Sequence, residues 1–330
     1  MTEPRQVRAL GLLSGGLGSM LAVKVVQAQG IAVTGISFST PFFGTAAAER
    51  AAARLGIALI VRNITAAHLN IVRHPLHGYG RTMNPCIDCH ALMIRIAGQV
   101  RQEQNFDFIF TGEVLNERPM SQTRRALEIV ADLSGCAEHL VRPLTAQCLP
   151  VSQPEKAGLI DREKLLNLQG RSRSGQIALA MQYGLTSYPN AAGGCLLTDK
   201  HFSARLRELM RVQPAAAEDD FRLLPLGRHY RLASGVKVIV GRDAQENSRL
   251  EQQAAPADTV VLSEAVPGPV CLVRASANAA DIGAAAEICA AYSDAAEGDL
   301  CRITVRRNRQ PAEYVTVAVR RSARLPRRIE

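Results

Sequence analysis

The chain has 330 residues, of which 47% are hydrophobic and 21% are charged, and it carries a formal net charge of +9. No apolar run reaches the roughly 18–20 residues of a membrane span, and 8 cysteines in this length do not indicate a disulfide scaffold. The positive charge fits a polyanionic partner, without telling RNA from DNA or acidic lipid. Met1 to Arg8 shows no signal-peptide pattern, so we expect a cytoplasmic protein.

The first half of the chain alternates apolar, β-like runs with helical patterns. Strands are expected at 7–13, 31–38, 57–61, 106–110 and 140–144, and helices at 20–28, 45–55, 66–73, 91–104 and 121–133. Such alternation predicts a doubly wound parallel α/β sheet with helices on both faces. Ligands of these sheets bind beyond the carboxyl ends of the strands.

A glycine-rich turn joins the first expected strand to the first expected helix. Its residues are Ser14, Gly15, Gly16, Leu17, Gly18 and Ser19. The glycines let the backbone approach a ligand closely, and free N–H groups at a helix start favour phosphate. No lysine follows the glycines, which excludes a Walker A loop. The segments 39–41 and 111–113 also follow expected strands, so we expect three loops at one edge of the sheet.

The second half of the chain has a different order of expected helices and strands. Helices are expected at 162–168, 175–183 and 200–210, and the stretch 214–221, rich in alanine and acids, is the predicted linker. Beyond it, short strands are expected between 221 and 240 and at 260–262, 270–273, 301–306 and 314–319, with helices at 244–253 and 279–292. We therefore predict a first domain at 1–213 and a smaller α+β domain at 222–330.

Three cysteines form the second informative group. Cys86 and Cys89 make a C-x-x-C pair, and Cys195, which follows two glycines, is the best third thiol. Two thiolates at this spacing can face one metal, and three with an open fourth position suit a [4Fe–4S] cluster. From spacing alone, zinc or a redox disulfide remains an equal alternative to the cluster.

Four stretches of the first half carry a resemblance to a known family. They are Ser14 to Ser19, Asn84 to Cys89, Thr111 to Gln122 and Arg142 to Leu144. In them the chain resembles PP-loop tRNA thiolation enzymes, and most closely the adenylating domain of tRNA 4-thiouridine synthetases of the ThiI type, over roughly residues 6–210. The resemblance implies a PP-loop fold, of the adenine nucleotide alpha hydrolase-like kind, that uses ATP and Mg²⁺.

The function implied by this resemblance is sulfur transfer to tRNA. The enzyme would adenylate a carbonyl oxygen of a uridine or cytidine and replace it with sulfur. ATP would be held by Ser14, Gly15, Gly16, Leu17, Gly18, Ser19, Thr111, Gly112 and Glu113. Because cluster-dependent relatives carry a C-x-x-C pair and one distant cysteine, the resemblance favours an iron–sulfur cluster on the catalytic residues Cys86, Cys89 and Cys195. Sulfide or a persulfide carrier protein would supply sulfur, and a homodimer is one expected assembly.

Position 18 departs from the family, which has aspartate where this chain has Gly18. Glycine supplies no carboxylate for the magnesium and phosphate end of the site, so Glu113 or another acid would have to replace it. We expect ATP still to bind and Gly18→Asp to raise adenylation. Three alternatives stay open: a non-catalytic RNA-binding protein with a degenerate PP-loop, an amide-forming PP-loop ligase, and a zinc-containing sulfurtransferase.

A second resemblance covers the smaller domain. The run from Gly241 to Leu250 resembles the opening of the RNA-binding domain of NFACT proteins, and the similarity spans roughly residues 222–320. It implies that Arg242, Asn247 and Arg249 contact RNA, and Arg142 of the first domain is a further expected contact with RNA or phosphate. Contacts of this kind position RNA without reading its sequence.

Overall fold

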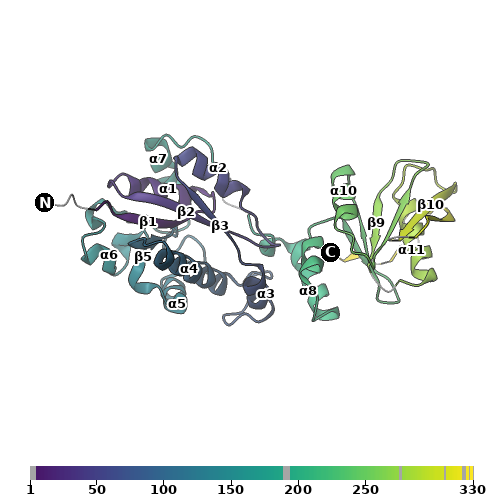
Figure 1. Cartoon of the computed structure of the whole chain (residues 1–330), viewed down its shortest axis with the longest axis horizontal. Coiled ribbons are helices and arrows are strands. Elements are labelled where there is room, and N and C mark those ends of the chain that lie inside the picture. Colours follow the sequence, from purple (N-terminus) through teal and green to yellow (C-terminus); the bar gives the residue numbers. More distant parts are fainter. Residues whose placement is uncertain are drawn as a thin grey trace. The chain divides into compact units, whose positions relative to one another are not determined.

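The computed structural model describes residues 5–188, 194–274, 277–307, 310–321, 325–326 and 328–329. The chain forms two compact units, Met1–Asp199 and Lys200–Glu330, each described here by itself (Figure 1). The boundary between the units falls at residue 199 in the chain. The helix that follows belongs to the second unit, because Glu208 forms ion pairs with Arg231 and Lys237. The functional domain limits at 213 and 222 stay a prediction. No helix in the described part of the chain is long and apolar enough to cross a membrane.

The first unit is built on a parallel sheet of five strands in the order β3-β2-β1-β4-β5. The strands are β1 (Arg8–Leu12), β2 (Ala32–Ser39), β3 (Leu59–Asn63), β4 (Phe108–Phe110) and β5 (Leu140–Val141). The helices are α1 (Leu17–Gln27), α2 (Ala46–Leu55), α3 (Thr65–Arg73), α4 (Cys86–Glu103), α5 (Arg124–Ser134), α6 (Gln153–Lys156) and α7 (Ser174–Gln182). The predicted doubly wound parallel fold is confirmed.

Helices cover both faces of this sheet, as Figure 1 shows, with α1, α2 and α7 on one side and α4 and α5 on the other. Successive side chains of a strand point to opposite faces, which explains the division. Ala9 packs in the cluster on the α1 side, and its neighbour Leu10 packs in the cluster on the α4 side. Because β1 is buried on both faces, it reads in the sequence as a continuous apolar run.

Two helices of the first unit begin earlier than the sequence pattern suggested. The first starts at Leu17 instead of 20, and the fourth starts at Cys86 instead of 91. Gly16 and Pro85 occupy the N-cap positions, where neither residue supplies a capping side chain. Neither boundary is therefore marked by a capping side chain that the sequence pattern could reveal. As a result, the last residues of the glycine-rich turn lie on the first turn of α1, and the C-x-x-C pair lies on the first turn of α4.

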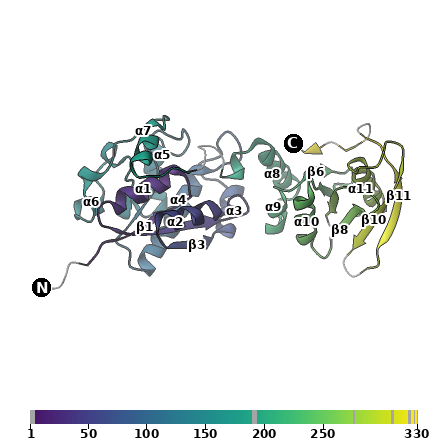
Figure 2. The same ribbon diagram turned by 90° about the horizontal axis from the view of Figure 1, so that it is seen from above.

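The second unit is an antiparallel sheet in the order β11-β10-β8-β9-β7-β6-β12, with two helices packed on it (Figure 2). The strands are β6 (Arg228–Arg231), β7 (Lys237–Val240), β8 (Thr259–Ser263), β9 (Val270–Val273), β10 (Leu300–Arg307), β11 (Glu313–Ala318) and β12 (Arg328–Ile329). The helices are α8 (Lys200–Val212), α9 (Glu218–Leu223), α10 (Ala244–Gln252) and α11 (Ala279–Ala291). The predicted smaller α+β domain is confirmed, whereas the stretch expected as a linker contains most of α9, whose first turn carries three acids that favour a helix start.

Candidate nucleotide and cysteine site

The glycine-rich turn leaves β1 at the carboxyl edge of the sheet and enters α1. Gly15 has a φ of +80°, and a Cβ there would lie 2.4 Å from the carbonyl oxygen of Ala47, so both the conformation and the approach of α2 require glycine. Ser19 Oγ donates to the Gly16 carbonyl at 2.8 Å, and Ser14 Oγ accepts from the Gly16 N–H at 3.3 Å. Leu17 is buried in the core, so only its backbone is available to a ligand.

A backbone contact joins this turn to the loop after β4. A Cβ at Gly18 would lie 2.7 Å from the carbonyl oxygen of Gly112, and a Cβ at Gly112 would lie 2.4 Å from the carbonyl carbon of Gly18. Real Cβ atoms essentially never come this close to backbone. The two expected ATP-binding motifs therefore meet through a pair of glycines, and the space beside Gly18 that a side chain would take is filled by the Gly112 carbonyl.

This contact contradicts the expectation that Gly18→Asp raises adenylation. We predict instead that Gly18→Ala and Gly18→Asp both weaken ATP binding, by about tenfold or more, because the added Cβ forces the two loops apart. Titration calorimetry of the full chain with ATP measures the effect. Gly44→Ala is the matched control, since its Cβ would meet nothing within 4 Å. ATP binding that is equal in Gly18→Ala and wild type would show that the paired glycines do not set the loop geometry.

Glu113 lies at the centre of a buried polar cluster, which we call the Glu113 cluster and which also contains Thr111, His90 and Arg142. One carboxylate oxygen, Oε1, is 2.8 Å from His90 Nδ1. The other, Oε2, accepts from Thr111 Oγ1 and from Arg142 Nε, both at 2.9 Å. The Arg142 side chain is 10% exposed and also donates to the Leu127 carbonyl.

The charge state of Glu113 follows from this cluster. Burial alone would raise its pKa, but the guanidinium of Arg142 and the hydrogen-bonded ring of His90 together lower the pKa to about 2. The carboxylate is therefore ionised and is neutralised by the protein's own side chains. Arg142 is drawn inward by this ion pair, so its structural role is to balance Glu113. Its contact with RNA, and the contact of Glu113 with Mg²⁺, stay predictions.

The C-x-x-C pair lies on the first turn of α4, directly before His90. Asn84 Nδ2 donates to Cys86 Sγ at 3.2 Å, and Asp88 accepts from the backbone N–H of His77 at 3.1 Å while its other oxygen lies 2.6 Å from His77 Nδ1. These contacts tie the loop before α4 to the first turn of the helix. Since His90 follows Cys89 immediately, the Glu113 cluster and the cysteine pair are neighbours on one helix end.

Cys195 belongs to a turn that is held against the same region. The N–H of Leu196 donates to the Phe42 carbonyl at 3.0 Å, and Thr82 Oγ1 donates to the Leu197 carbonyl at 2.7 Å. These two bonds anchor the Cys195 turn to the loop after β2 and to the segment before α4. The fold thereby brings Cys195 to this region, although it lies more than 100 residues after Cys89 in the sequence.

The three thiols, Cys86, Cys89 and Cys195, are close enough for their charges to interact. Burial raises the pKa of Cys89 well above its usual value, and the neighbouring Cys195, Cys86 and Asp88 raise it further. Burial, with a smaller contribution from Cys86, raises the pKa of Cys195 to about 12. All three are free thiols. Among the described residues, no three histidine, cysteine or acidic side chains are spaced to hold a single metal ion.

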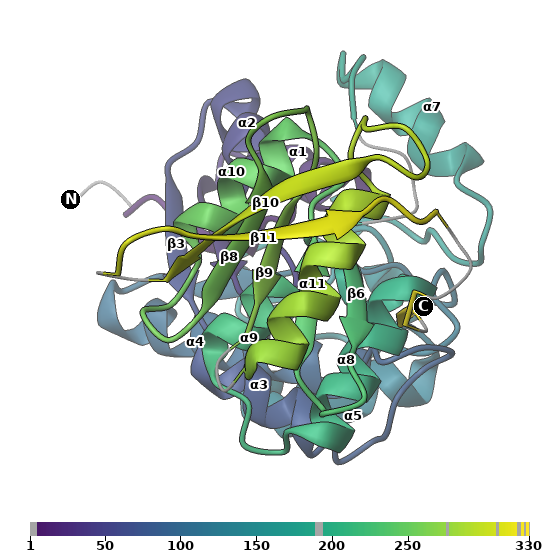
Figure 3. The ribbon, with the colours of Figure 1, turned by 90° about the vertical axis from the view of Figure 1, so that its right-hand side faces the viewer.

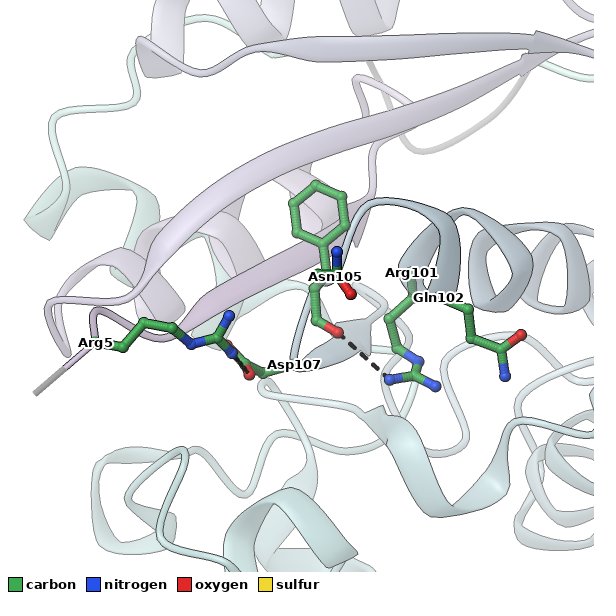
Figure 4. A pocket seen from close by; sticks show the side chains of 6 residues that line it. Arg5, Arg101, Gln102, Asn105 and Asp107 are labelled. Atoms are coloured by element: carbon green, nitrogen blue, oxygen red, sulfur yellow. Dashed lines mark hydrogen bonds and ion pairs between the residues drawn. The ribbon is translucent and has the colours of Figure 1, made fainter.

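A separate hollow of about 420 Å³ lies at the opposite edge of the sheet (Figure 4). It is lined by Arg5, Arg101, Gln102, Asn105, Phe106 and Asp107. Arg5 pairs with Asp107, and Arg101 donates to the Phe106 carbonyl at 3.4 Å, so these charges are already engaged. Because these residues precede β1 and β4, the hollow lies at the amino ends of the strands, away from the glycine-rich turn.

The three expected RNA contacts of the second unit differ in their surroundings. Arg242 lies just before α10, and Asn247 and Arg249 lie within the helix. Arg242 donates through Nε to Glu246 at 2.9 Å, and Arg249 is exposed. Asn247 is structural, since its Oδ1 accepts from the Val270 N–H at 2.9 Å and fixes the loop before β9. RNA contact by all three stays a prediction, and the geometry favours Arg249 and the exposed part of Arg242 for it.

Sequence reasoning missed two members of the site: His90, which contacts the Glu113 carboxylate, and Asn84, which donates to a cysteine sulfur. Arg142 was expected to contact RNA or phosphate, and the structure pairs it with Glu113. The available signal was position, because Arg142 follows a short strand and the other two flank the C-x-x-C pair. Such positions place polar side chains at the carboxyl edge of the sheet, but do not say which of them pair.

Comparisons with known proteins agree with the two-part organisation. Residues 5–147 match the family model described as thiamine biosynthesis protein (ThiI), and residues 227–326 match the NFACT protein RNA binding domain. A search of curated proteins finds no match.

Three solved structures are similar to parts of the chain. NMN synthetase from Francisella tularensis is 13% identical, with 67% of this chain and 84% of that chain covered and a TM-score of 0.38. A predicted subunit of tRNA methyltransferase from Methanocaldococcus jannaschii is 15% identical, with 53% and 76% covered and a TM-score of 0.33. A 4-thiouridine synthetase in complex with RNA and ATP is 17% identical, with 66% and 51% covered and a TM-score of 0.34. The two family matches show that the chain carries a stretch similar to ThiI, at residues 5–147, and a stretch similar to the NFACT RNA-binding domain, at residues 227–326.

Proposed function

We propose that the protein is an ATP-dependent tRNA sulfurtransferase, with catalysis in residues 1–213 and RNA binding in residues 222–330. One observation carries the proposal. The glycine-rich turn, the Glu113 cluster and the three thiols are linked by direct contacts at the carboxyl edge of one parallel sheet. An ATP site beside a sulfur-handling site is what adenylation followed by sulfur transfer requires.

The nucleotide end is supported by the glycine-rich turn. ATP, with Mg²⁺, would place its phosphates against the free N–H groups at the start of α1 and beside the hydroxyls of Ser14 and Ser19. The carbonyl oxygen of a tRNA uridine or cytidine attacks the α-phosphorus of ATP. The bond from the α-phosphorus to the oxygen that bridges to the β-phosphorus breaks, and pyrophosphate leaves. The base is then joined to AMP through its former carbonyl oxygen.

The sulfur end is supported by the donor set of Cys86, Cys89 and Cys195. A zinc ion with Zn–S bonds of about 2.3 Å needs thiols almost in contact, whereas a cluster spreads its thiolates over separate iron atoms. The three thiols interact electrostatically, and three thiolates with an open fourth position suit a [4Fe–4S] cluster, with zinc as the alternative group. When bound, a cluster held by three thiolates supplies an open iron position for a sulfur ligand. Sulfide then attacks the activated carbon, and AMP leaves with the former carbonyl oxygen. Where a persulfide carrier delivers the sulfur, its terminal sulfur first joins the base carbon as a disulfide with the carrier; a second cysteine thiol then breaks the S–S bond, which releases the thionucleoside and leaves a disulfide between that cysteine and the carrier.

The Glu113 cluster prepares the site for these charges. Arg142 and His90 are held in fixed positions by the ionised carboxylate, so the site does not have to reorganise when ATP arrives. Thr111 and Gly112 continue this loop toward Gly18, which places their backbone groups beside the nucleotide end. Asn84, through its hydrogen bond to Cys86 Sγ, fixes the position of this sulfur.

Mass spectrometry of tRNA nucleosides from a strain that lacks the gene tests the proposal. One thionucleoside should disappear and should return when the wild-type gene is restored. The purified protein should release pyrophosphate from ATP in the presence of tRNA that lacks this modification. An unchanged thionucleoside profile would reject sulfur transfer, and tRNA binding without pyrophosphate release would favour the non-catalytic RNA-binding alternative.

A further inference from the structure

One face of the second sheet is only partly covered. Helix α11 packs on the side that carries Cys301, Ile303 and Val305 of β10. Helix α10 packs on the other side, but its apolar contacts reach only as far as Val260 and Leu262 of β8. Beyond β8, the strands β10 and β11 complete this side of the sheet (Figure 3), and on their second face Arg302 and Tyr314 are exposed whereas Thr304 is buried.

The side chains on this second face follow from strand register. Arg302 is paired with Thr316, and Thr304 is paired with Tyr314, so all four point to the same side of the sheet. Glu264 directly follows β8, whose Ser263 is paired with Ile303. Together Glu264, Ala265, Arg302, Thr304 and Tyr314 line an open hollow of about 260 Å³.

Two side chains of the hollow have unusual surroundings. Tyr314 is 52% exposed and is the only exposed aromatic side chain among the described residues, although the chain has 6 tyrosines and 8 phenylalanines. The guanidinium of Arg302 lies 3.8 Å from the centroid of the Tyr314 ring and makes no ion pair with a described residue. By contrast, the neighbours Arg306 and Arg307 pair with Glu251 and Glu313. Arg302 and Tyr314 thus form a flat, cationic and accessible stack.

We propose that this hollow binds one unpaired base of a single-stranded RNA segment. An aromatic ring and a guanidinium plane are the two surfaces on which proteins stack unpaired bases. Arg302 can at the same time meet an adjacent phosphate, which supplies the charge complementarity. The carboxylate of Glu264 in the same hollow accepts hydrogen bonds and repels phosphate, so it favours a base with an exocyclic amino group over uracil. The proposal deepens the role of the second unit as the RNA-binding unit, and does not depend on sulfur transfer.

Binding of short RNA oligonucleotides by the full chain tests this site. We would measure fluorescence anisotropy of labelled hexamers of cytidine, adenosine and uridine without ATP. The cytidine and adenosine hexamers should bind more tightly than the uridine hexamer. Tyr314→Ala should weaken binding roughly 5- to 150-fold, as expected for loss of one stacked base, and Tyr314→Phe should stay within about twofold of wild type. Arg302→Ala should weaken binding and reduce the salt dependence by about one phosphate contact.

Two controls make the outcome decisive. Arg211→Ala removes an exposed arginine elsewhere in the same unit and should leave hexamer binding unchanged. Glu264→Gln should reduce the difference between the cytidine and uridine hexamers. Equal binding by Tyr314→Ala and wild type, with both folded by circular dichroism, would overturn the site. Hexamer binding that is absent in wild type would overturn it as well, while a normal thionucleoside profile in the same Tyr314→Ala strain would leave sulfur transfer standing.

Discussion

Replacing Cys89 with serine is expected to abolish both the bound iron and the thionucleoside. Serine keeps the size of the side chain but is a poor ligand for iron, so the three-thiol set loses one member. Cys89 interacts electrostatically with both Cys195 and Cys86, so it belongs to the three-thiol set. Iron and acid-labile sulfide should fall from about four per chain to near background after anaerobic purification. Cys195→Ser should have the same effect, because the Cys195 turn is fixed by its own backbone hydrogen bonds.

Cys148→Ser is the matched control for this experiment. Cys148 is also a partly buried free thiol of the first unit, but its sulfur contacts the Asn167 carbonyl and none of the three thiols. Its iron content and thionucleoside level should stay at the wild-type values. Zinc in place of iron in the wild-type protein would support the zinc-containing alternative. Normal thiolation by Cys89→Ser would remove the cysteines from the proposed reaction.

The three cysteines also show which parts of the candidate site can be predicted from the sequence. The C-x-x-C spacing and the glycines before Cys195 are local signals, and they were sufficient to predict the three residues. The contacts that bring Cys195 to the pair run through the Phe42 and Leu197 carbonyls. A backbone carbonyl has no sequence signature, so these contacts are invisible before folding.

The parallel sheet was predictable for a similar reason, because it rests on periodicity within short runs. Ala9 and Leu10 belong to a continuous apolar run, and the structure buries them on opposite faces of one strand. Helix starts were less predictable. Gly16 and Pro85 occupy N-caps without a capping side chain, so the helices there depend on tertiary packing.

Gly18 is a residue whose role the sequence alone predicts wrongly. Compared with the family motif alone, it reads as a missing carboxylate that Gly18→Asp would restore. In the fold, the Gly112 backbone occupies the space that a side chain at this position needs. Gly18 and Gly112, which are far apart in the sequence, therefore form one backbone contact, and neither residue can be interpreted without the other. How the site then binds Mg²⁺ depends on groups other than a side chain at 18.

Glu113→Gln is expected to be strongly destabilising, by about 3–5 kcal/mol, because it leaves the largely buried Arg142 guanidinium beside a neutral group. The Glu113 side chain is only 7% exposed, so solvent does not compensate for the lost charge. For a unit of this size, the loss corresponds to a fall in melting temperature of about 6–20 °C. Differential scanning calorimetry of the full chain measures it. Glu128→Gln, on the exposed face of α5, is the control and should change stability by less than about 0.5 kcal/mol.

The effect of Glu113→Gln should also depend on pH in a defined direction. In the folded chain the pKa of Glu113 is about 2, below its ordinary value of 4.5, so the unfolded chain binds the proton more readily. The stabilisation from the carboxylate is therefore complete above about pH 4.5 and is lost as the pH falls toward 2. Urea unfolding should show a smaller difference between wild type and Glu113→Gln near pH 3 than near pH 7.

A double variant separates the charge pair from simple loss of packing. Arg142→Met alone leaves the Glu113 carboxylate without its guanidinium, and it should be destabilising for the same reason as Glu113→Gln. Glu113→Gln combined with Arg142→Met removes both charges, so its cost should be clearly smaller than the sum of the two single changes. Additive costs would mean that the two side chains act independently. Since the same ion pair holds Arg142 at the strand end, the double variant should fold yet bind ATP more weakly than wild type. Such weaker binding would assign the Glu113 cluster to the nucleotide site as well as to the core, and unchanged ATP binding would assign it to the core alone.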